Sequence, residues 1–312
     1  MLARGRHLLV ASSLLWSAGA LGAPFPDPVG LGSGAYVFFG AREEPNRANQ
    51  GHVANQGFIV AAEGVIIVDS GASAAFAEHM LRAIRARTDK AVVLVILTRP
   101  IDEAIFGATV FQRQGASILA HRAASQLIAE RCETCLKNLT SVLGEDLMSG
   151  TRVPRPDRVF EGRQRLAAAG RSLELLDYSG AAAPGSIAVW DRESGVLFAG
   201  GLASFARIPE TRDGVLADWI VALQDLAGVP ARAIVPAHGP IGKQADLASV
   251  AAYLRALDDR TARAYAARMS LLDATRTIAV PEYRGWALYE PVHARNVHYA
   301  YVARERRELA KP

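Results

Sequence analysis

The sequence is poor in cysteine, in long apolar runs and in excess charge. Its 312 residues include only Cys132 and Cys135, so a fold held by several disulfides is excluded. Beyond the N-terminal region, no segment approaches the roughly 20 consecutive apolar residues that a spanning helix needs, and we expect no membrane span in the mature chain. A formal net charge of +4 is too small to argue for nucleic-acid binding.

The first residues have the order of a secretory signal peptide. Arg4 and Arg6 precede an apolar run from Leu8 to Trp16, and small residues follow that run. The run is too short for an uncleaved membrane anchor. We therefore expect residues 1–22 to be removed on export, leaving a periplasmic or secreted chain with a net charge of about +2.

The rest of the chain contains two series of strands and helices. The first begins with a hairpin that turns at Glu63-Gly64 and continues with a helix over 74–87, the strand "KAVVLVIL", one short helix over 103–115 and a helix over 126–143. The second contains the strands of "GSIAVWDRESGVLFAGG" and "ARAIVPAHGP", together with amphipathic helices. This order predicts an α/β fold with two sheets and helices outside them.

The order of these segments resembles the metallo-β-lactamase superfamily over roughly residues 35–243. The landmarks are "GVIIVDSG", "VLVILT", "PGSIAVWDRESGVLFAGG" and "IVPAHGP". The resemblance implies a four-layer αββα sandwich over residues 23–245, with metal at the shared edge of the two sheets. It also leaves a C-terminal helical and aromatic extension over 246–312, which we expect to pack on that domain.

Three further segments are similar to a subgroup, the quinoprotein relay system zinc metallohydrolases. They are "ERCETCLKNLTSVLGEDLMSGTRVPRP", "RIPETRDGVLADWIVALQDL" and "RGWALYEPVHARNVHYAYVARE". Proteins of this subgroup are exported and are associated with periplasmic quinoprotein dehydrogenases. The resemblance therefore implies components of such a dehydrogenase system as partners.

The metal-ligand motifs of the superfamily are degenerate in this chain. When the loop motif H-x-H-x-D-H-x-x-G is aligned on Gly107, its four ligands fall on Arg99, Ile101, Glu103 and Ala104. The histidine of G-H-T-P-G-S, the bridging aspartate and the last histidine fall on Ala182, Gly201 and His238. One imidazole, even with Glu103, lacks the three or four protein ligands that zinc needs. We therefore expect no metal or other cofactor, and we predict a pseudoenzyme.

The charged residues of the former metal loop are candidates for a ligand site. An arginine at position 99 can replace a cation by pairing with Glu103 or Asp102, and it can also hold a carboxylate or phosphate bidentately. The alternative is a solvated surface ion pair of little consequence. Asp69 supports the ligand loop in the superfamily, although a turn role also explains it. His238, Glu103 and Asp102 are the catalytic candidates, but no partner that would activate His238 is identifiable.

Two other features have simpler interpretations. A C-x-x-C segment in an exported chain can be a disulfide, a redox pair or half of a zinc site. Because Cys132 and Cys135 fall within a helical stretch, we favour a local disulfide or two unreactive thiols. His121 follows the strand "SILA", and we interpret it as a strand-end histidine whose hydrogen bonds are satisfied.

Three functional hypotheses follow from these residues. The first is an exported, non-catalytic binding or accessory protein, whose partner is a quinoprotein dehydrogenase component or a small anionic ligand. The second is a metal-dependent hydrolase with a rebuilt or single-metal site, for which zinc would be the cofactor. The third is a redox protein that uses Cys132 and Cys135.

Overall fold

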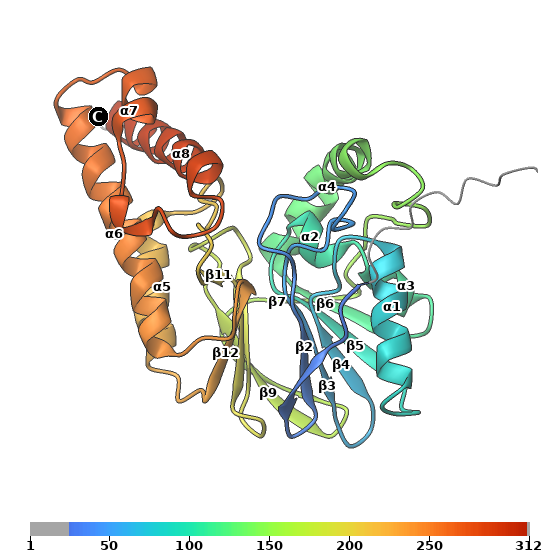
Figure 1. Ribbon diagram of the computed structural model, residues 1–312. Helices are drawn as coiled ribbons and strands as arrows, with labels where there is room; N and C mark the ends of the chain where they lie inside the picture. Colours follow the sequence, from blue (N-terminus) through green and yellow to red (C-terminus); the bar gives the residue numbers. More distant parts are fainter. Residues whose placement is uncertain (1–24, 311–312) are drawn as a thin grey trace, which may run out of the picture.

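Two β-sheets lie face to face with helices on both outer sides (Figure 1). This computed structural model describes residues 25–310, so the expected signal peptide, 1–22, falls outside the described residues. The first sheet has the strand order β1-β2-β3-β4-β5-β6-β7, and the second has the order β12-β11-β10-β9-β8. The predicted α/β class and four-layer αββα sandwich are confirmed.

The lengths and directions of the strands in the two sheets determine where the connecting loops lie. The first sheet consists of β1 (Val29–Gly32), β2 (Ala35–Phe38), β3 (Gln56–Val60), β4 (Val65–Val68), β5 (Val92–Leu97), β6 (Ser117–His121) and β7 (Arg158–Phe160). The second consists of β8 (Gln164–Ala168), β9 (Arg171–Asp177), β10 (Ile187–Asp191), β11 (Val196–Ser204) and β12 (Ala233–His238). β3 and β4 form the predicted hairpin, whereas β4, β5 and β6 run parallel. Parallel strands bring their carboxyl ends to one edge, where ligands usually bind.

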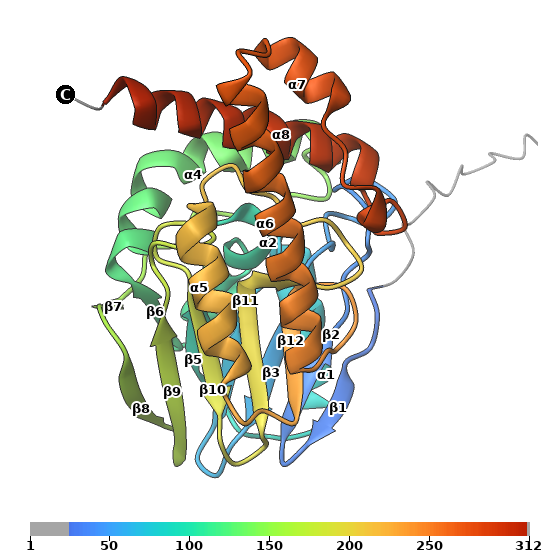
Figure 2. The same ribbon diagram turned by 90° about the vertical axis from the view of Figure 1, so that its left-hand side faces the viewer.

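The helices form the two outer layers. Those on the first sheet are α1 (Ala74–Arg85), α2 (Asp102–Ile105), α3 (Ala108–Gln112) and α4 (Arg122–Leu143). Those of the second half are α5 (Leu216–Ala227), α6 (Gln244–Ala266), α7 (Leu271–Thr277), the 3-10 helix η1 (Pro281–Tyr283) and α8 (Tyr289–Leu309). Figure 2 shows α5 and α6 over the outer face of the second sheet, with α8 crossing above them. α6 therefore belongs to the outer layer of the sandwich, and the remaining tail packs against it.

One helix boundary differs from the prediction. The segment 103–115 is two helices rather than one, because the N–H of Gly107 donates to the carbonyl of Gly71 instead of to a partner within a helix. The backbones approach so closely here that a Cβ on Gly107 would lie 2.1 Å from the carbonyl oxygen of Ser70. The short helix α2 is consequently held against the end of β4, next to the residues that follow β5.

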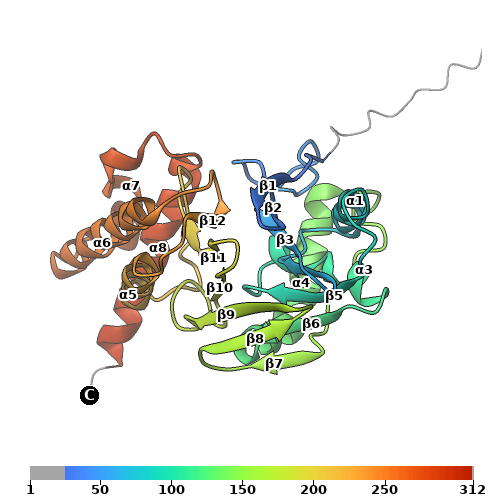
Figure 3. The same cartoon turned by 90° about the horizontal axis from the view of Figure 1, so that it is seen from below.

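Three hydrophobic clusters fill the three interfaces between the four layers. One contains Phe76 and Phe111 between the first sheet and its helices, and the second contains Ile66 and Val189 between the sheets. The third contains Trp219 and packs α5, α6 and α8 on the second sheet. Figure 3 shows the resulting succession of layers from below. Among the described residues, no helix is both long enough and apolar enough to cross a membrane.

Candidate functional site

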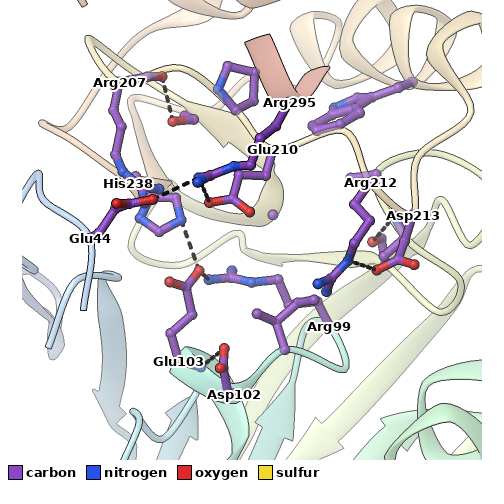
Figure 4. Close-up of a pocket in the computed structure, with 18 of the residues that line it drawn as sticks. Glu44, Arg99, Asp102, Glu103, Arg207, Glu210, Arg212, Asp213, His238 and Arg295 are labelled. Carbon is purple, nitrogen blue, oxygen red and sulfur yellow. Dashed lines mark hydrogen bonds and ion pairs between the residues drawn. The ribbon is translucent and has the colours of Figure 1, made fainter. Parts of the chain in front are cut away.

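A cavity of about 330 Å³ lies beyond the carboxyl ends of β5 and β12 (Figure 4). Its lining includes the aligned ligand positions Arg99, Ile101, Glu103, Ala182, Gly201 and His238. The last aligned position, Ala104, lies instead in the hydrophobic core. Other charged lining residues are Glu44, Asp102, Arg207, Glu210, Arg212, Asp213 and Arg295. The fold therefore gathers nearly all the predicted site residues around one hollow.

Asp69 holds the start of the loop that follows β5. It stands just after β4 with a φ of 58°, in the left-handed region that aspartate tolerates better than most residues. Its carboxylate accepts hydrogen bonds from the backbone N–H of Thr98 at 2.8 Å and from the Thr98 hydroxyl at 2.7 Å. Burial raises the pKa of Asp69, against the charge of Arg99 and the bonds from Thr98. Asp69 does not line the cavity, and its role is to position the neighbouring residues.

Arg99 points into the cluster of acids rather than to solvent. Its Nη2 donates to Oε1 of Glu103 at 2.8 Å, and its Nη1 lies 3.6 Å from Oδ2 of Asp69. Only 4% of the Arg99 side chain and 14% of the Glu103 side chain are exposed, so a solvated surface ion pair is the wrong description. A Cβ on Gly201 would lie 2.8 Å from Cδ of Arg99. An aspartate at position 201 therefore does not fit beside Arg99 in this arrangement.

Glu103 joins Arg99 to His238. The Glu103 oxygen that accepts from Arg99 lies 2.9 Å from Nε2 of His238, and Nδ1 of His238 donates to the Val53 carbonyl at 2.9 Å. Burial raises the pKa of Glu103, but His238, Arg99 and Arg207 outweigh it and hold the pKa well below its usual range. Burial lowers the pKa of His238, and the charge of Glu103 opposes that shift. Because Nε2 needs a proton to bond a carboxylate, this contact is strongest when His238 is protonated.

Asp102 is separate from this cluster. Its Oδ1 accepts from the backbone N–H of Glu103 at 2.9 Å, at the beginning of α2, and it makes no ion pair with Arg99 in the described structure. Burial and the neighbouring charge of Glu103 raise the pKa of Asp102 to about 6. Asp102 is still mostly ionised at pH 7, but its carboxylate bonds the backbone of α2 and not the guanidinium of Arg99.

The residues present do not fit a dinuclear zinc site. The positions Ile101, Ala104, Ala182 and Gly201 offer no ligating side-chain atom. Glu103 and His238 do, but they bind each other, and Arg99 occupies the carboxylate as well. Within residues 25–310, no group of three or more histidine, cysteine, aspartate or glutamate side chains is arranged to hold a metal. A guanidinium stands at the aligned position of the first ligand.

Solved structures similar to this chain share one architecture. A metallo-β-lactamase from Pontibacter korlensis gives a TM-score of 0.61 at 22% identity, over 73% of this chain and 98% of that one. The DIM-1 metallo-β-lactamase gives 0.57 at 16% identity, over 74% and 98%. A double mutant of the sec-alkyl sulfatase PisA1 gives 0.70 at 13% identity, over 89% of this chain but 50% of that one. The chain has the metallo-β-lactamase fold.

At these identities the likeness establishes the fold alone. No family model matches the sequence, and no curated protein matches it. The quinoprotein relay subgroup therefore stays a prediction, as does the assignment of individual ligand positions on this metallo-β-lactamase fold.

Sequence reasoning missed most of the arginines and acids around the cavity. Arg207 follows β11 in "SFARIPE", where only its position after a strand end marks it. Arg295, on α8, pairs with Glu44 at 2.8 Å and lies 3.7 Å from Glu210. It reaches the cavity from the tail, and no local pattern indicates this.

The remaining predicted residues lie outside the cavity. Nε2 of His121 contacts Asp177 at 3.2 Å, and its Nδ1 accepts from the N–H of Ala123, so its hydrogen bonds are satisfied as expected. Cys132 and Cys135 are free thiols on α4, with no disulfide between them. The hydrogen bond between the thiols raises the pKa of Cys132 and lowers that of Cys135 to about 7.

Proposed function

We propose that this chain is an exported, non-catalytic binding or accessory protein of a periplasmic quinoprotein dehydrogenase system. The observation that supports a non-catalytic role is the buried ion pair between Arg99 and Glu103. An arginine side chain stays charged in proteins, so it is a permanent cation at this place and repels a metal ion. The four aligned positions without ligating atoms add to this support.

The cavity supports binding as the role that the fold retains. Its volume of about 330 Å³ lies at the small end of the range for small-molecule sites. Charged side chains converge on it together with Trp219 and the small residues Ala182 and Ala183. Such a combination of charged groups and apolar walls suits a small, partly apolar organic ligand.

The test is the metal content of the mature protein, purified without chelator, together with zinc titration by calorimetry. We expect less than one tenth of a zinc ion per chain, as an order-of-magnitude threshold, and no tight zinc binding at pH 7.5. The Arg99→His and Gly201→Asp double variant serves as a comparison, because it returns two ligand types to the pocket. One or two tightly held zinc ions in the wild-type protein would refute the proposal.

A second candidate function is hydrolysis through a rebuilt site. The Glu103 and His238 pair, with 2.9 Å between Oε1 and Nε2, favours it because a carboxylate next to an imidazole can act in general acid-base catalysis. A panel of ester, thioester and lactam substrates, with and without zinc, tests it. Turnover that disappears in His238→Ala would support the hydrolase and overturn the non-catalytic role.

The proposed partner and location have their own tests. Dehydrogenase activity is measured in periplasmic extracts of a strain that lacks this gene, complemented with wild-type or Arg99→Met protein. We expect the activity to fall without the gene and to return with the wild-type chain. Mass spectrometry of the secreted or periplasmic protein should show a mature N-terminus after residue 22, within a few residues.

A further inference from the structure

Arg207 is a buried cation in the cavity whose charge acts on Glu103 and His238 but whose guanidinium contacts neither of them directly. Only 2% of the residue is exposed, and it lines the same hollow as Arg99 and His238 (Figure 4). Among the described residues, its side chain makes no hydrogen bond or ion pair, and its Nε is buried without an acceptor. The other arginines of the cavity are paired: Arg99 with Glu103, Arg212 with Asp213 and Arg295 with Glu44.

The backbone holds Arg207 in place independently of its side chain. The hydroxyl of Ser204 donates to the carbonyl of Arg207 at 2.7 Å, and Arg207 forms an isolated parallel bridge with Ala287. The N–H of the next residue, Ile208, also donates to Ala287. The guanidinium is therefore presented from a fixed backbone, which lowers the ordering cost of binding a ligand.

In the part of the chain that the structure describes, the Nε of Arg207 is buried without an acceptor, which is unfavourable in the free protein because that N–H loses its hydration without gaining a partner. Glu103, the carboxylate whose pKa the Arg207 charge helps to lower, already binds both Arg99 and His238 through one oxygen. A hydrogen-bond acceptor from a bound ligand would therefore explain why Arg207 is buried at this place. A ligand with two coplanar oxygens matches a guanidinium bidentately.

We propose that Arg207 binds the carboxylate of a small organic monoacid, with the apolar part of that acid against Ile101, Ala182 and Trp219. This inference rests on the proposed function, because it needs a cavity without metal. One unpaired cation balances one negative charge. The acids Glu210 and Asp213, which also line the cavity, disfavour a dianion such as phosphate.

The probes are benzoate, its neutral analogue benzamide, and inorganic phosphate, titrated into mature protein by calorimetry. We expect benzoate to bind at least about tenfold more tightly than benzamide, which cannot form a charge-assisted hydrogen bond, and than phosphate, which Glu210 and Asp213 repel more strongly. Arg207→Gln should lose that tenfold preference, and Arg207→Lys should keep part of it. Arg122→Gln, which removes an exposed arginine paired with Glu161, is the control and should bind as the wild type does.

The thermal midpoint separates a ligand anchor from a structural arginine. Without ligand, Arg207→Gln should unfold at the same temperature as the wild type or higher, because it removes an unpaired buried charge. A lower midpoint with unchanged benzoate binding would overturn the inference. So would an absence of benzoate binding, or equal affinities for benzoate and benzamide in the zinc-free wild type. Zinc in the same preparation would instead refute the proposed function, whatever the benzoate result.

Discussion

Removing the Arg99 side chain should expose how much the buried cation contributes to stability. In Arg99→Met, Glu103 and Asp69 both keep their burial and lose the cation that lies 2.8 Å and 3.6 Å from them. Breaking a buried ion pair from one side costs about 3–5 kcal/mol, and we expect a loss of that size. Since domains are stable by about 5–15 kcal/mol, the variant should be strongly weakened but able to fold.

The double variant makes this prediction specific to charge. Glu103→Gln alone should also be destabilising, because Arg99 then has only Asp69 as an acid partner. In Arg99→Met with Glu103→Gln, most of the uncompensated charge is gone. We therefore expect the double variant to be more stable than the sum of the single effects predicts, by at least about 2 kcal/mol.

Urea unfolding followed by near-UV circular dichroism at pH 7.5 measures these free energies. The slopes with urea should agree among the variants, so that the midpoints reflect stability. Arg122→Met, which removes an exposed arginine, should change stability by less than about 0.5 kcal/mol. A loss below about 1 kcal/mol in Arg99→Met, or single effects that add within about 0.5 kcal/mol, would refute the reasoning.

Three further predictions concern space and protonation. Gly201→Ala should destabilise the wild type by about 1–3 kcal/mol in urea unfolding, but by much less in an Arg99→Ala background; equal losses in both would contradict the steric argument. Burial lowers the pKa of His52 to about 4 from 6.5, so its stabilisation is complete above pH 6.5 and is lost as the pH falls towards 4. The free-energy difference between wild type and His52→Phe should therefore change by about 3 kcal/mol across that window, and a flat difference would show that His52 is not buried neutral. Asp102 has its pKa raised to about 6, so Asp102→Asn should stabilise the protein at pH 8 by about 1–3 kcal/mol and have little effect at pH 4, the reverse order being the contrary result.

The parts of the fold with a strong local pattern were predictable. The apolar run of β5 and the Glu63-Gly64 turn appear at the expected places, because alternation and turn chemistry act over a few residues. The division of 103–115 into two helices was not predictable. It depends on the approach of Gly107 to Gly71, a contact that no helical period reports.

The site also has a part that local sequence patterns predict and a part that depends on contacts between distant residues. The residues after β5 and β12 were identified because the motif used for the alignment lies in continuous segments. Arg99 is buried and contacts Glu103 and Asp69, but not Asp102. These contacts depend on how strand ends from separate parts of the chain come together in the fold. Arg207 was missed because the burial of its Nε without an acceptor among residues 25–310 is a property of the three-dimensional structure and leaves no local sequence pattern.

The geometry around Arg99 makes the residues at positions 69, 99, 103 and 201 depend on one another. A long cation at position 99 needs both space and negative charge. Gly201 supplies the space, since any Cβ there would meet the Arg99 stem, and Glu103 and Asp69 supply the charge. An aspartate at position 201 would clash with that stem, while a neutral histidine at position 99 would leave two buried carboxylates without a permanent cation. The residues at positions 99 and 201 therefore depend on each other, and the ion cluster accounts for the burial of Glu103 and Asp69 beside Arg99.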